Sequence, residues 1–411
     1  MRIAVLGAGT AGHMAVAHIA HHLPLASITH FYDPQTAPIG VGEGTTPVFT
    51  NWANQVMGWD FAFLEKHCDA TPKAGIVFEG WGPDGADYTH FFGTSEGEAC
   101  HLSAARLAAQ LAIHSPADVV EQRVLSIAVQ DAIAHVALET GDLEFDFVFD
   151  ARGFPKSIDG EHVELGCVPT NSAILARGLP RAPRDCTRAV ARPHGWVFVI
   201  PLGSETAYGY VHGQQESVDA RADFESFLDE EGVQPRLPFR SLQFPNFRRV
   251  ATFDGVVFAI GNRAGFIEPL EATALGLTVL QLQVATFWIL DRALGQRDGS
   301  VNGINEALAN TVDEVATFIG WHYARGAPYA TPFWERAVDR FDTWLETRTS
   351  EQRRRFESYA ERGMAHPREL AFAMSVADLD RLQGADIARR DTYGGFFDLS
   401  FAKVGHGIGW S

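Results

Sequence analysis

Cysteine is scarce in this chain of 411 residues. Cys68, Cys100, Cys167 and Cys186 lie far apart, and no two of them form a Cys-x-x-Cys pair. Disulfide frameworks and zinc sites are built from closely spaced cysteines. The pattern therefore predicts reduced, buried thiols in a cytoplasmic protein, with no metal site.

Positive charge is also in short supply, since the formal net charge is −18 at pH 7. A nucleic-acid groove or an anionic membrane surface needs a surplus of lysine and arginine, so neither is expected as a partner. The longest apolar stretch, Ala272 to Leu290, contains Gln281 and Gln283 near its centre, which favours a buried core helix over a membrane span. The apolar run before Gly7 is too short for a signal peptide, so we expect a soluble, cytoplasmic protein.

The composition is that of a folded protein, with 46% hydrophobic, 11% aromatic and 20% charged residues. This balance excludes disorder over most of the chain. The length predicts two or three domain-sized units, enough to form a core without disulfides or a structural metal.

The N-terminus has the pattern of a dinucleotide-binding unit. A continuous apolar run at residues 2–6 predicts a buried parallel strand, and the loop Gly7-Ala8-Gly9-Thr10-Ala11-Gly12 leads into a helix from His13 to His22. A second strand, Ser27 to Tyr32, ends at Asp33. Glycines let the backbone approach a pyrophosphate at the helix N-terminus, and the acidic residue can accept a hydrogen bond from a ribose hydroxyl.

Later segments predict that this nucleotide fold is interrupted and resumed, as is expected when the cofactor is FAD. Strands are expected at Leu143 to Asp150 and Gly255 to Ile260, the second followed by Gly261-Asn262-Arg263-Ala264-Gly265. Strands at 196–201 and 207–212 belong to a second, antiparallel sheet. Helices follow at 275–294, 304–324, 332–348 and 350–362.

The predicted fold class is α/β: a Rossmann-like FAD-binding domain with an inserted antiparallel sheet and a helical C-terminal substrate region. The FAD-binding module spans 1–275, with nucleotide-binding pieces at 1–50, 143–155 and 250–275 and the inserted sheet at about 160–250. The mainly helical region spans 276–411.

Seven segments occur in an order that matches a known family. They are the glycine loop at 7–12, Ile39 to Pro47, Lys73 to Phe78 with Trp81, Asp150 to Phe154, Trp196 to Leu202, Gly261 to Thr273, and His322-Tyr323 with Pro332-Phe333-Trp334. On these segments the chain resembles the flavin-dependent halogenases, typified by tryptophan halogenases, over most of its length.

The resemblance implies a reaction. Reduced FAD, supplied by a separate flavin reductase, would use oxygen and a halide ion to form hypohalous acid. Lys73 would hold that acid beside an electron-rich aromatic substrate such as an indole, and Glu271 would stabilise the cationic ring and help to remove its proton. The substrate could be a small aromatic compound or a peptide, and a homodimer is compatible with the resemblance.

The resemblance also assigns the remaining site residues. The halide would bind the backbone N–H groups of Thr273 and Ala274, and Trp196, Phe198 and Pro201 would form a wall that shields the flavin. FAD would be held by three groups of residues: Gly7, Gly9, Thr10, Ala11, Gly12 and Asp33; Gly40, Val41, Gly42 and Glu43; and Gly261, Asn262 and Gly265.

Each assignment has a purely structural alternative. Without the resemblance, Lys73 would be interpreted as a surface lysine, Glu271 as an anion favoured by the start of a helix, and the aromatic wall as ordinary strand packing. His18, His21 and His22 share one helix face, and we interpret them as helix surface rather than as metal ligands. The run Arg353 to Arg355 is interpreted as a solvated helix face.

Three departures from the family pattern support a second function. Ala274 stands where glycine is usual, Phe198 stands where a second tryptophan is usual, and the chain is short for the family. A flavin-dependent monooxygenase that hydroxylates an aromatic or peptide-borne tryptophan substrate is therefore the alternative. A flavin-binding protein without turnover is a third reading, and the presence of both Lys73 and Glu271 argues against it.

Overall fold

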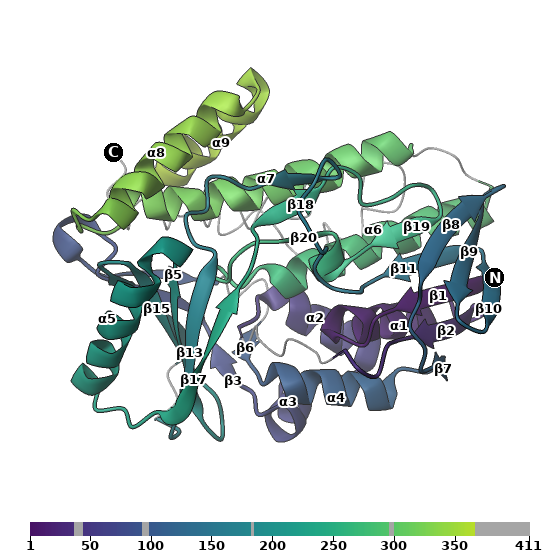
Figure 1. Cartoon of the computed structure of the whole chain (residues 1–411), viewed down its shortest axis with the longest axis horizontal. Helices are drawn as coiled ribbons and strands as arrows, with labels where there is room; N and C mark the ends of the chain where they lie inside the picture. Colours follow the sequence, from purple (N-terminus) through teal and green to yellow (C-terminus); the bar gives the residue numbers. More distant parts are fainter. Residues whose placement is uncertain (37–43, 93–97, 182–184, 296–299, 366–411) are drawn as a thin grey trace.

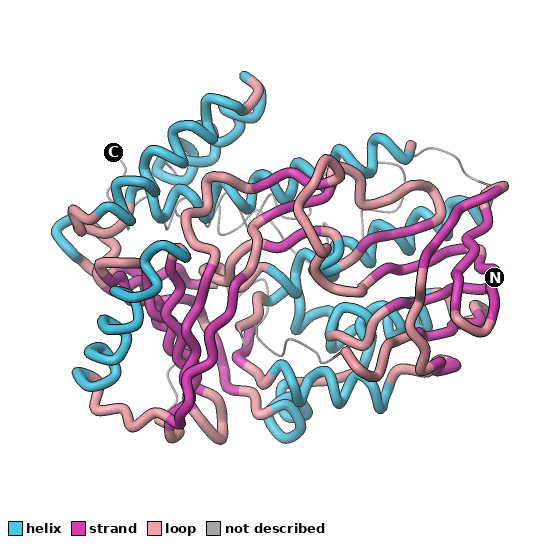
Figure 2. The backbone as a smooth tube through the Cα atoms, viewed as in Figure 1, coloured by secondary structure: helices cyan, strands magenta, loops and turns pink. Residues whose placement is uncertain are grey.

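The computed structural model describes residues 1–36, 44–92, 98–181, 185–295 and 300–365. Figure 1 shows a parallel sheet near the N-terminus and a larger sheet at the other end of the molecule, with α6 above the parallel sheet and α7 along the upper part of the view. Figure 2 shows the strands gathered in these two regions and the helices packed between and outside them. Gly40, Val41, Gly42 and Glu43, predicted to bind the cofactor, lie outside the described residues.

The N-terminal sheet has five parallel strands in the order β19-β11-β1-β2-β7. Ile3 to Leu6 in β1 are fully buried, as a continuous apolar run predicts for a strand covered on both faces. The strands are β1 (Arg2–Leu6), β2 (Ser27–Phe31), β7 (Asp118–Val120), β11 (Phe147–Asp150) and β19 (Val257–Ala259). The predicted nucleotide-type α/β architecture is confirmed.

The prediction of one strand from Leu143 to Asp150 is wrong. The segment divides at Asp146, which leaves β10 (Gly141–Phe145) in an antiparallel sheet with β8 (Ser126–Gln130) and β9 (Ile133–Leu138). The Asp146 carboxylate accepts a hydrogen bond from the Arg2 backbone N–H at 2.6 Å. The acidic residue thus marks the change from the mostly exposed β10 to the fully buried β11.

The larger sheet has seven strands in the order β17-β13-β16-β15-β14-β4-β5. The predicted antiparallel pair at 196–201 and 207–212 is confirmed, although β14 and β4 run parallel. The strands are β4 (Gly75–Glu79), β5 (Tyr88–Phe91), β13 (Ser172–Gly178), β14 (Cys186–Arg192), β15 (Gly195–Pro201), β16 (Thr206–His212) and β17 (Arg236–Gln243). Alternation along β15 sends Val197 and Val199 toward helix α5 (Ser217–Glu230) and Trp196 and Phe198 toward the main core.

Two small sheets complete the strands of the described chain. One joins β3 (Thr71–Lys73) to β6 (Ala99–His101), and the other joins β12 (His162–Glu164), β18 (Phe247–Arg249) and β20 (Gly265–Phe266). The first of these sheets carries the predicted catalytic lysine. Three of the four cysteines are buried as expected, Cys186 is half-buried, and all four are free thiols.

The helices support the sheets and extend the chain toward its C-terminus. They are α1 (Thr10–His22), α2 (Pro47–Met57), α3 (Phe61–Cys68), α4 (Ala104–His114), α5, α6 (Ala274–Ala293), α7 (Val301–Arg325), α8 (Pro332–Thr347) and α9 (Ser350–Ala365). The four helices predicted after residue 275 are confirmed. The division into two units at residue 275 stays a prediction. Helix α6, which begins the second unit, packs against α1 and α2.

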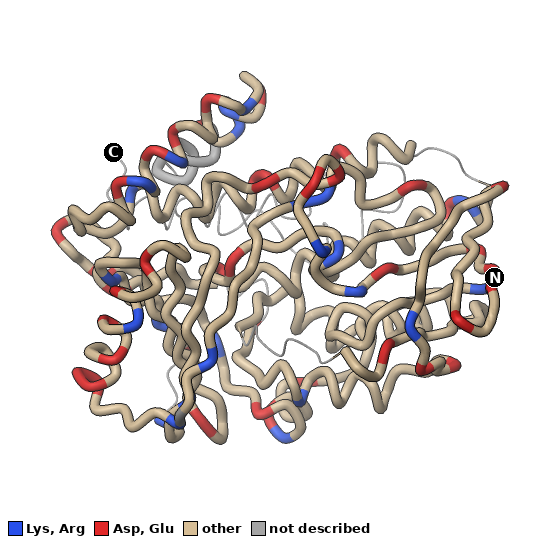
Figure 3. Tube along the Cα trace, in the orientation of Figure 1, with Lys and Arg blue, Asp and Glu red and all other residues tan. Residues whose placement is uncertain are grey.

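Helix α6 passes for a membrane span on length and composition alone, yet half of its most apolar window is buried inside the protein. Gln281 is buried within it and accepts a hydrogen bond from the Gly261 N–H at 2.8 Å. Both features are those of a core helix, as the two central glutamines predict. Figure 3 shows charges of both signs along α8 and α9, where Arg353 to Arg355 are exposed.

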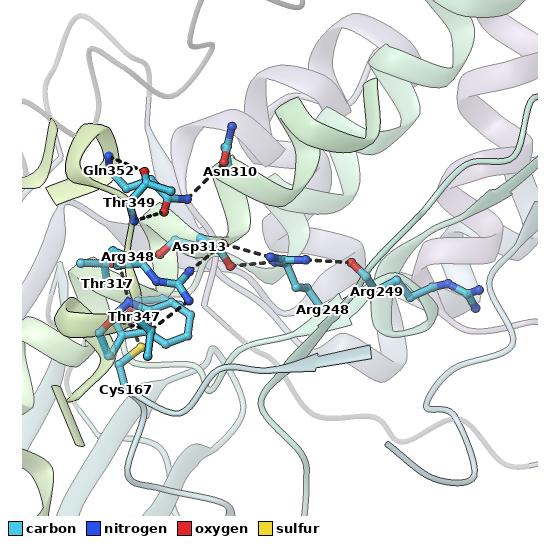
Figure 4. A network of polar contacts seen from close by, with 12 residues as sticks. Cys167, Arg248, Arg249, Asn310, Asp313, Thr317, Thr347, Arg348, Thr349 and Gln352 are labelled. Atoms are coloured by element: carbon cyan, nitrogen blue, oxygen red, sulfur yellow. Dashed lines mark hydrogen bonds and ion pairs between the residues drawn. The ribbon is translucent and has the colours of Figure 1, made fainter. Parts of the chain in front are cut away.

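A buried carboxylate joins the C-terminal helices to the strands (Figure 4). Asp313 in α7 accepts hydrogen bonds from Arg248 of β18 at 2.7 and 3.1 Å and from Arg348, which follows α8, at 2.9 Å. The Arg348 guanidinium also lies 3.7 Å from the ring centre of Trp344. One anion therefore pairs with two cations that come from separate elements.

We expect Asp313→Asn to lower the free energy of unfolding by about 3 kcal/mol, because two partly buried guanidinium groups lose their counter-ion. Asp342→Asn is the matched control, since Asp342 pairs with Arg325 at the surface at 3.2 Å, where such pairs contribute less than about 1 kcal/mol. Scanning calorimetry of both variants checks this. Equal melting temperatures would contradict a structural role for Asp313.

Candidate active site

The dinucleotide motifs converge at one edge of the parallel sheet. The loops after β1, β2, β11 and β19 all lie at the carboxyl ends of these strands, where α/β sheets bind ligands. A Cβ on Gly7 would lie 2.5 Å from the Ala151 carbonyl oxygen, and a Cβ on Gly261 would lie 2.5 Å from the Ala11 Cβ. The described parts of the three predicted nucleotide-binding pieces, 1–50, 143–155 and 250–275, therefore contact one another.

This edge has the features that a dinucleotide requires. Gly7 has φ +107°, and a Cβ on Gly12 would lie 1.9 Å from the Gly7 carbonyl oxygen, so neither position tolerates a side chain. A Cβ on Gly9 would meet no atom within 4 Å, which leaves open space beside the loop. Helix α1 begins at Thr10 and directs its first N–H groups at that space. The described residues thus fit the pyrophosphate of FAD.

Asp33, Gly261, Asn262 and Gly265 also lie around this edge. Asp33 directly follows the strand β2 and accepts a hydrogen bond from the Gln35 N–H at 2.9 Å. Gly261 and Asn262 form a short 3-10 turn after β19, and Gly265 begins β20. A charged cluster adjoins them: burial would raise the pKa of Asp150, but hydrogen bonds from Arg152 and the charge of Arg263 hold it below its usual value.

Glu271 is the most tightly held carboxylate of this region. It is fully buried, 3.0 Å from Nδ1 of His90 and 2.8 Å from Nε2 of His322. Burial alone would raise its pKa, but the two imidazoles overcome that effect and lower the pKa to about 2. Glu271 is therefore an ionised carboxylate at neutral pH, inside the protein rather than at a solvated helix start.

Lys73 lies close to this carboxylate. Its side chain is buried, its Nζ donates to the Thr45 carbonyl at 3.0 Å, and Nζ lies 5.0 Å from the ring centre of Phe92. Burial lowers the pKa of Lys73 to about 8, against the opposing charge of Glu271. The interpretation as a surface lysine is wrong, because β3 pairs with β6 and directs Lys73 inward.

The backbone around Lys73 is closely packed. A Cβ on Gly44 would lie 3.2 Å from the lysine Nζ and 3.2 Å from the Cβ of Ala272. Thr45 is anchored to Cys100 by three hydrogen bonds of 2.8 to 3.0 Å. Lys73 is thus held between the segment at 44–45 and the turn that carries Glu271.

The predicted halide residues form the start of α6. Ala272 has φ +54°, a left-handed conformation that is uncommon outside glycine, and Thr273 is buried. Ala274 is the first residue of the helix and is exposed, and the N–H groups of a first turn have no partner within their own helix. The Cβ of Ala274 therefore does not prevent the helix from beginning where the family pattern requires it.

The three residues of the predicted flavin-shielding wall differ in their burial and in their contacts. Trp196 is fully buried and its indole N–H donates to the Tyr323 hydroxyl at 2.6 Å. Phe198 is half-buried and covers Gly209, where a Cβ would lie 2.1 Å from the phenylalanine Cζ. Pro201 accepts a hydrogen bond from the Thr71 hydroxyl at 2.6 Å. Since Thr71 and Lys73 share β3, this contact joins the wall to the lysine strand.

Sequence reasoning missed several residues of this region. It gave no role to His90, His322 or Glu268. The pair at i and i+3 was visible in Glu-Pro-Leu-Glu, whereas nothing in the sequence near His90 relates it to a carboxylate 181 positions away. Burial raises the pKa of Glu268 to about 8. At neutral pH Glu268 is therefore mostly protonated and neutral, whereas Glu271 is ionised.

The interpretation of the α1 histidines as helix surface is wrong for His18. His21 and His22 are exposed, but His18 is buried and its Nδ1 accepts a hydrogen bond from the Trp52 indole at 3.1 Å. Burial lowers its pKa to about 3. Among the described residues no three histidine, cysteine or acidic side chains are grouped to hold a metal ion.

Comparison with known proteins agrees with these motifs. The family model for tryptophan halogenase matches residues 2–110 and 98–372. SttH, a tryptophan 6-halogenase of Streptomyces toxytricini, is 28% identical over 279 residues, which cover 60% of this chain and only 51% of the length of SttH. RebH, a tryptophan 7-halogenase of Lentzea aerocolonigenes, is 23% identical over 417 residues, covering 81% of this chain and 78% of RebH.

Solved structures show the same fold. Xcc4156, a flavin-dependent halogenase from Xanthomonas campestris, superposes with a TM-score of 0.78 at 22% identity, covering 100% of this chain and 89% of that chain. MibH, a lanthipeptide tryptophan 5-halogenase, gives a TM-score of 0.78 at 22% identity, covering 100% and 86%. At this level of identity the likeness establishes the architecture.

The raised pKa of Glu268 makes stability depend on pH. Its usual pKa is 4.5 and its pKa in the folded chain is about 8, so its contribution is complete below about pH 4.5 and is lost as the pH rises through 8. Glu268→Gln cannot ionise, and we expect its melting temperature, relative to the wild type, to rise between pH 5 and pH 9. Thermal unfolding at three pH values measures this.

The exposed Glu164→Gln is the matched control for that measurement. Its melting temperature should follow the wild type at every pH. If Glu268→Gln also follows the wild type, Glu268 is not protonated in the folded protein.

Proposed function

Because the chain belongs to the tryptophan halogenase family, we propose that it is an FAD-dependent enzyme that halogenates an electron-rich aromatic ring of the indole or tryptophan type. The observation that carries this proposal is the burial of both Lys73 and Glu271, with the lysine next to the turn that carries the glutamate. A lysine and an ionised carboxylate without solvent contact are costly to bury. Such a pair is characteristic of a site with a chemical task.

The described residues support FAD as the cofactor, and its reduced form would supply the oxidising power for the halide once it meets oxygen. The glycine loop and the turn at Gly261 would hold the pyrophosphate, and Asp33 would accept from the ribose. No second dinucleotide loop was found in the sequence, so we propose that a separate flavin reductase delivers the reduced cofactor. A halide would bind the free N–H groups of Thr273 and Ala274 at the start of α6.

Lys73 would hold the oxidised halogen beside the substrate. With a pKa of about 8, its ammonium group is mostly charged at pH 7 and can donate hydrogen bonds to hypohalous acid. The apolar surroundings that lower this pKa also keep bulk water away from the acid. The Thr45 carbonyl takes one of the three N–H donors, and among the described residues no second hydrogen bond of Nζ is present, so the other donors could serve the oxidant.

Glu271 is better suited to stabilise the cationic ring than to retain a proton. Its two histidines lower its pKa to about 2, and a carboxylate of such low pKa binds a proton weakly. It supplies a fixed negative charge toward which the positive charge of the substituted ring develops. His90 and His322, which contact it directly, hold that charge in place.

The substrate class follows from the family and the fold together. SttH and RebH act on tryptophan by name, and MibH halogenates a tryptophan of a lanthipeptide. We propose an indole ring, free or within a peptide. The half-buried Phe198 in the shielding wall supports the second candidate, a monooxygenase that transfers oxygen to the same class of substrate.

Lys73→Ala should abolish halogenated product, with a loss of at least about 100-fold, because the oxidant is no longer held beside the substrate. The assay supplies FAD, a flavin reductase with NADH, oxygen and bromide, and analyses tryptophan, indole and a tryptophan-containing peptide by mass spectrometry. Lys66→Ala on the exposed face of α3 is the matched control and should retain activity. An oxygenated product that forms without halide would establish the monooxygenase instead.

We expect the yield of halogenated product per oxygen consumed to fall as the pH rises through about 8, because Lys73 loses its proton there. Below that pH the ammonium group donates hydrogen bonds, and above it the neutral amine donates fewer. Oxygen consumption measured in parallel separates this effect from slower flavin oxidation. A yield that rises above pH 8 would mean that Lys73 acts as a neutral nucleophile.

A further inference from the structure

Two buried histidines lie behind the glycine loop, and neither belongs to the predicted cofactor residues. Nε2 of His30 in β2 lies 2.8 Å from the Gly7 carbonyl oxygen. A hydrogen bond with the backbone of Ala8 raises the pKa of His13 in α1, as donation from the imidazole to the Ala8 carbonyl does. The two rings meet edge to face, 5.0 Å apart, and their side chains are 3% and 9% exposed. Two successive peptide carbonyls of the loop therefore face two imidazoles.

Because peptide groups are planar, these contacts also fix the directions of the N–H groups on the opposite face of the loop. In a planar trans peptide the C=O and N–H groups point in opposite directions. When the Gly7 carbonyl points at His30, the Ala8 N–H points away from it. When the Ala8 carbonyl points at His13, the Gly9 N–H points away likewise. The histidines thus orient two consecutive backbone donors toward the open space beside Gly9.

That orientation has to be enforced, because glycine-containing peptides rotate easily. If either peptide turned over, a carbonyl oxygen would face the space where a phosphate is expected, and the two negative groups would repel each other. A carbonyl accepts only, so His30 must carry its proton on Nε2. Burial lowers the pKa of both rings, to about 4 for His13, which keeps them neutral and leaves each with a single N–H donor.

We propose that His30 and His13 are positioning residues for the cofactor: they donate hydrogen bonds to the Gly7 and Ala8 carbonyls and thereby preset the Ala8 and Gly9 N–H groups for the pyrophosphate. The inference rests on the proposed FAD site and deepens it. An aromatic or aliphatic side chain would fill the same volume behind the loop. It would leave the carbonyl oxygens buried without a hydrogen-bond donor, which would destabilise this conformation of the loop.

The test is a fluorescence titration of the purified protein with oxidised FAD, which needs no halide, reductase or substrate. His30→Phe preserves the ring and removes the donor, and we expect the dissociation constant for FAD to increase about tenfold. His30→Gln retains an N–H donor and should restore affinity to within about threefold of the wild type. His13→Phe and His13→Gln should repeat the pattern at the second carbonyl.

The exposed His21→Gln on the same helix as His13 is the control and should bind FAD as the wild type does. Melting temperatures without FAD identify any variant that is unfolded, and the glutamine variants then carry the comparison. Wild-type affinity in both phenylalanine variants would overturn the proposal, because the histidines would then only fill space. A wild-type protein that binds no FAD would instead refute the proposed cofactor, and a halogenation assay that fails despite tight FAD binding would leave this inference standing.

Discussion

The arrangement of this molecule depends on an ionised carboxylate that has no access to water. Glu271 is fully buried, and it stays charged because His90 and His322 approach its two oxygens from different elements. His90 comes from the edge strand of the seven-stranded sheet and His322 from the last turns of α7. Sheet, helix and the turn before α6 must therefore meet at one point, since an unpaired carboxylate there would be strongly destabilising.

Helix α6 connects this point to the dinucleotide edge. Its first residues carry the N–H groups proposed for the halide, and Gln281, two turns further on and about 10 Å away, holds the Gly261 N–H at the cofactor edge. Half of its most apolar window is buried inside the protein, between the two sites. The geometry of the cofactor edge and that of the Lys73–Glu271 pair are thus fixed by a single rigid element.

The two carboxyl groups of Glu-Pro-Leu-Glu show how environment separates identical side chains. Glu271 faces imidazoles and has a pKa of about 2, while Glu268 lies among Tyr323, Trp196 and apolar side chains and has a pKa of about 8. Because the two groups are close enough to repel each other, the neutral state of one favours the charged state of the other. The site therefore carries one negative charge, on Glu271, rather than two.

The sequence by itself determined the parts of this protein that depend on local pattern. The apolar run before the glycine loop, the alternation along β15 and the periodicity of the C-terminal helices follow from residues adjacent in the chain, so their positions could be predicted closely. The strand expected at Leu143 to Asp150 failed because the exchange of pairing partners at Asp146 is not a local property. Lys73 and Glu271 were identified through resemblance to a family, not from their own surroundings.

Only the tertiary structure decided what surrounds those residues. The burial of Lys73, the histidines on Glu271, the protonated state of Glu268 and the imidazoles behind the glycine loop all join positions distant in sequence. Their pKa values depend on desolvation and on charges a few ångströms away, which no order of residues along the chain specifies. The order of residues determined the helices and strands. The charge states depend on packing, because packing brings distant side chains together in the interior, where water is excluded.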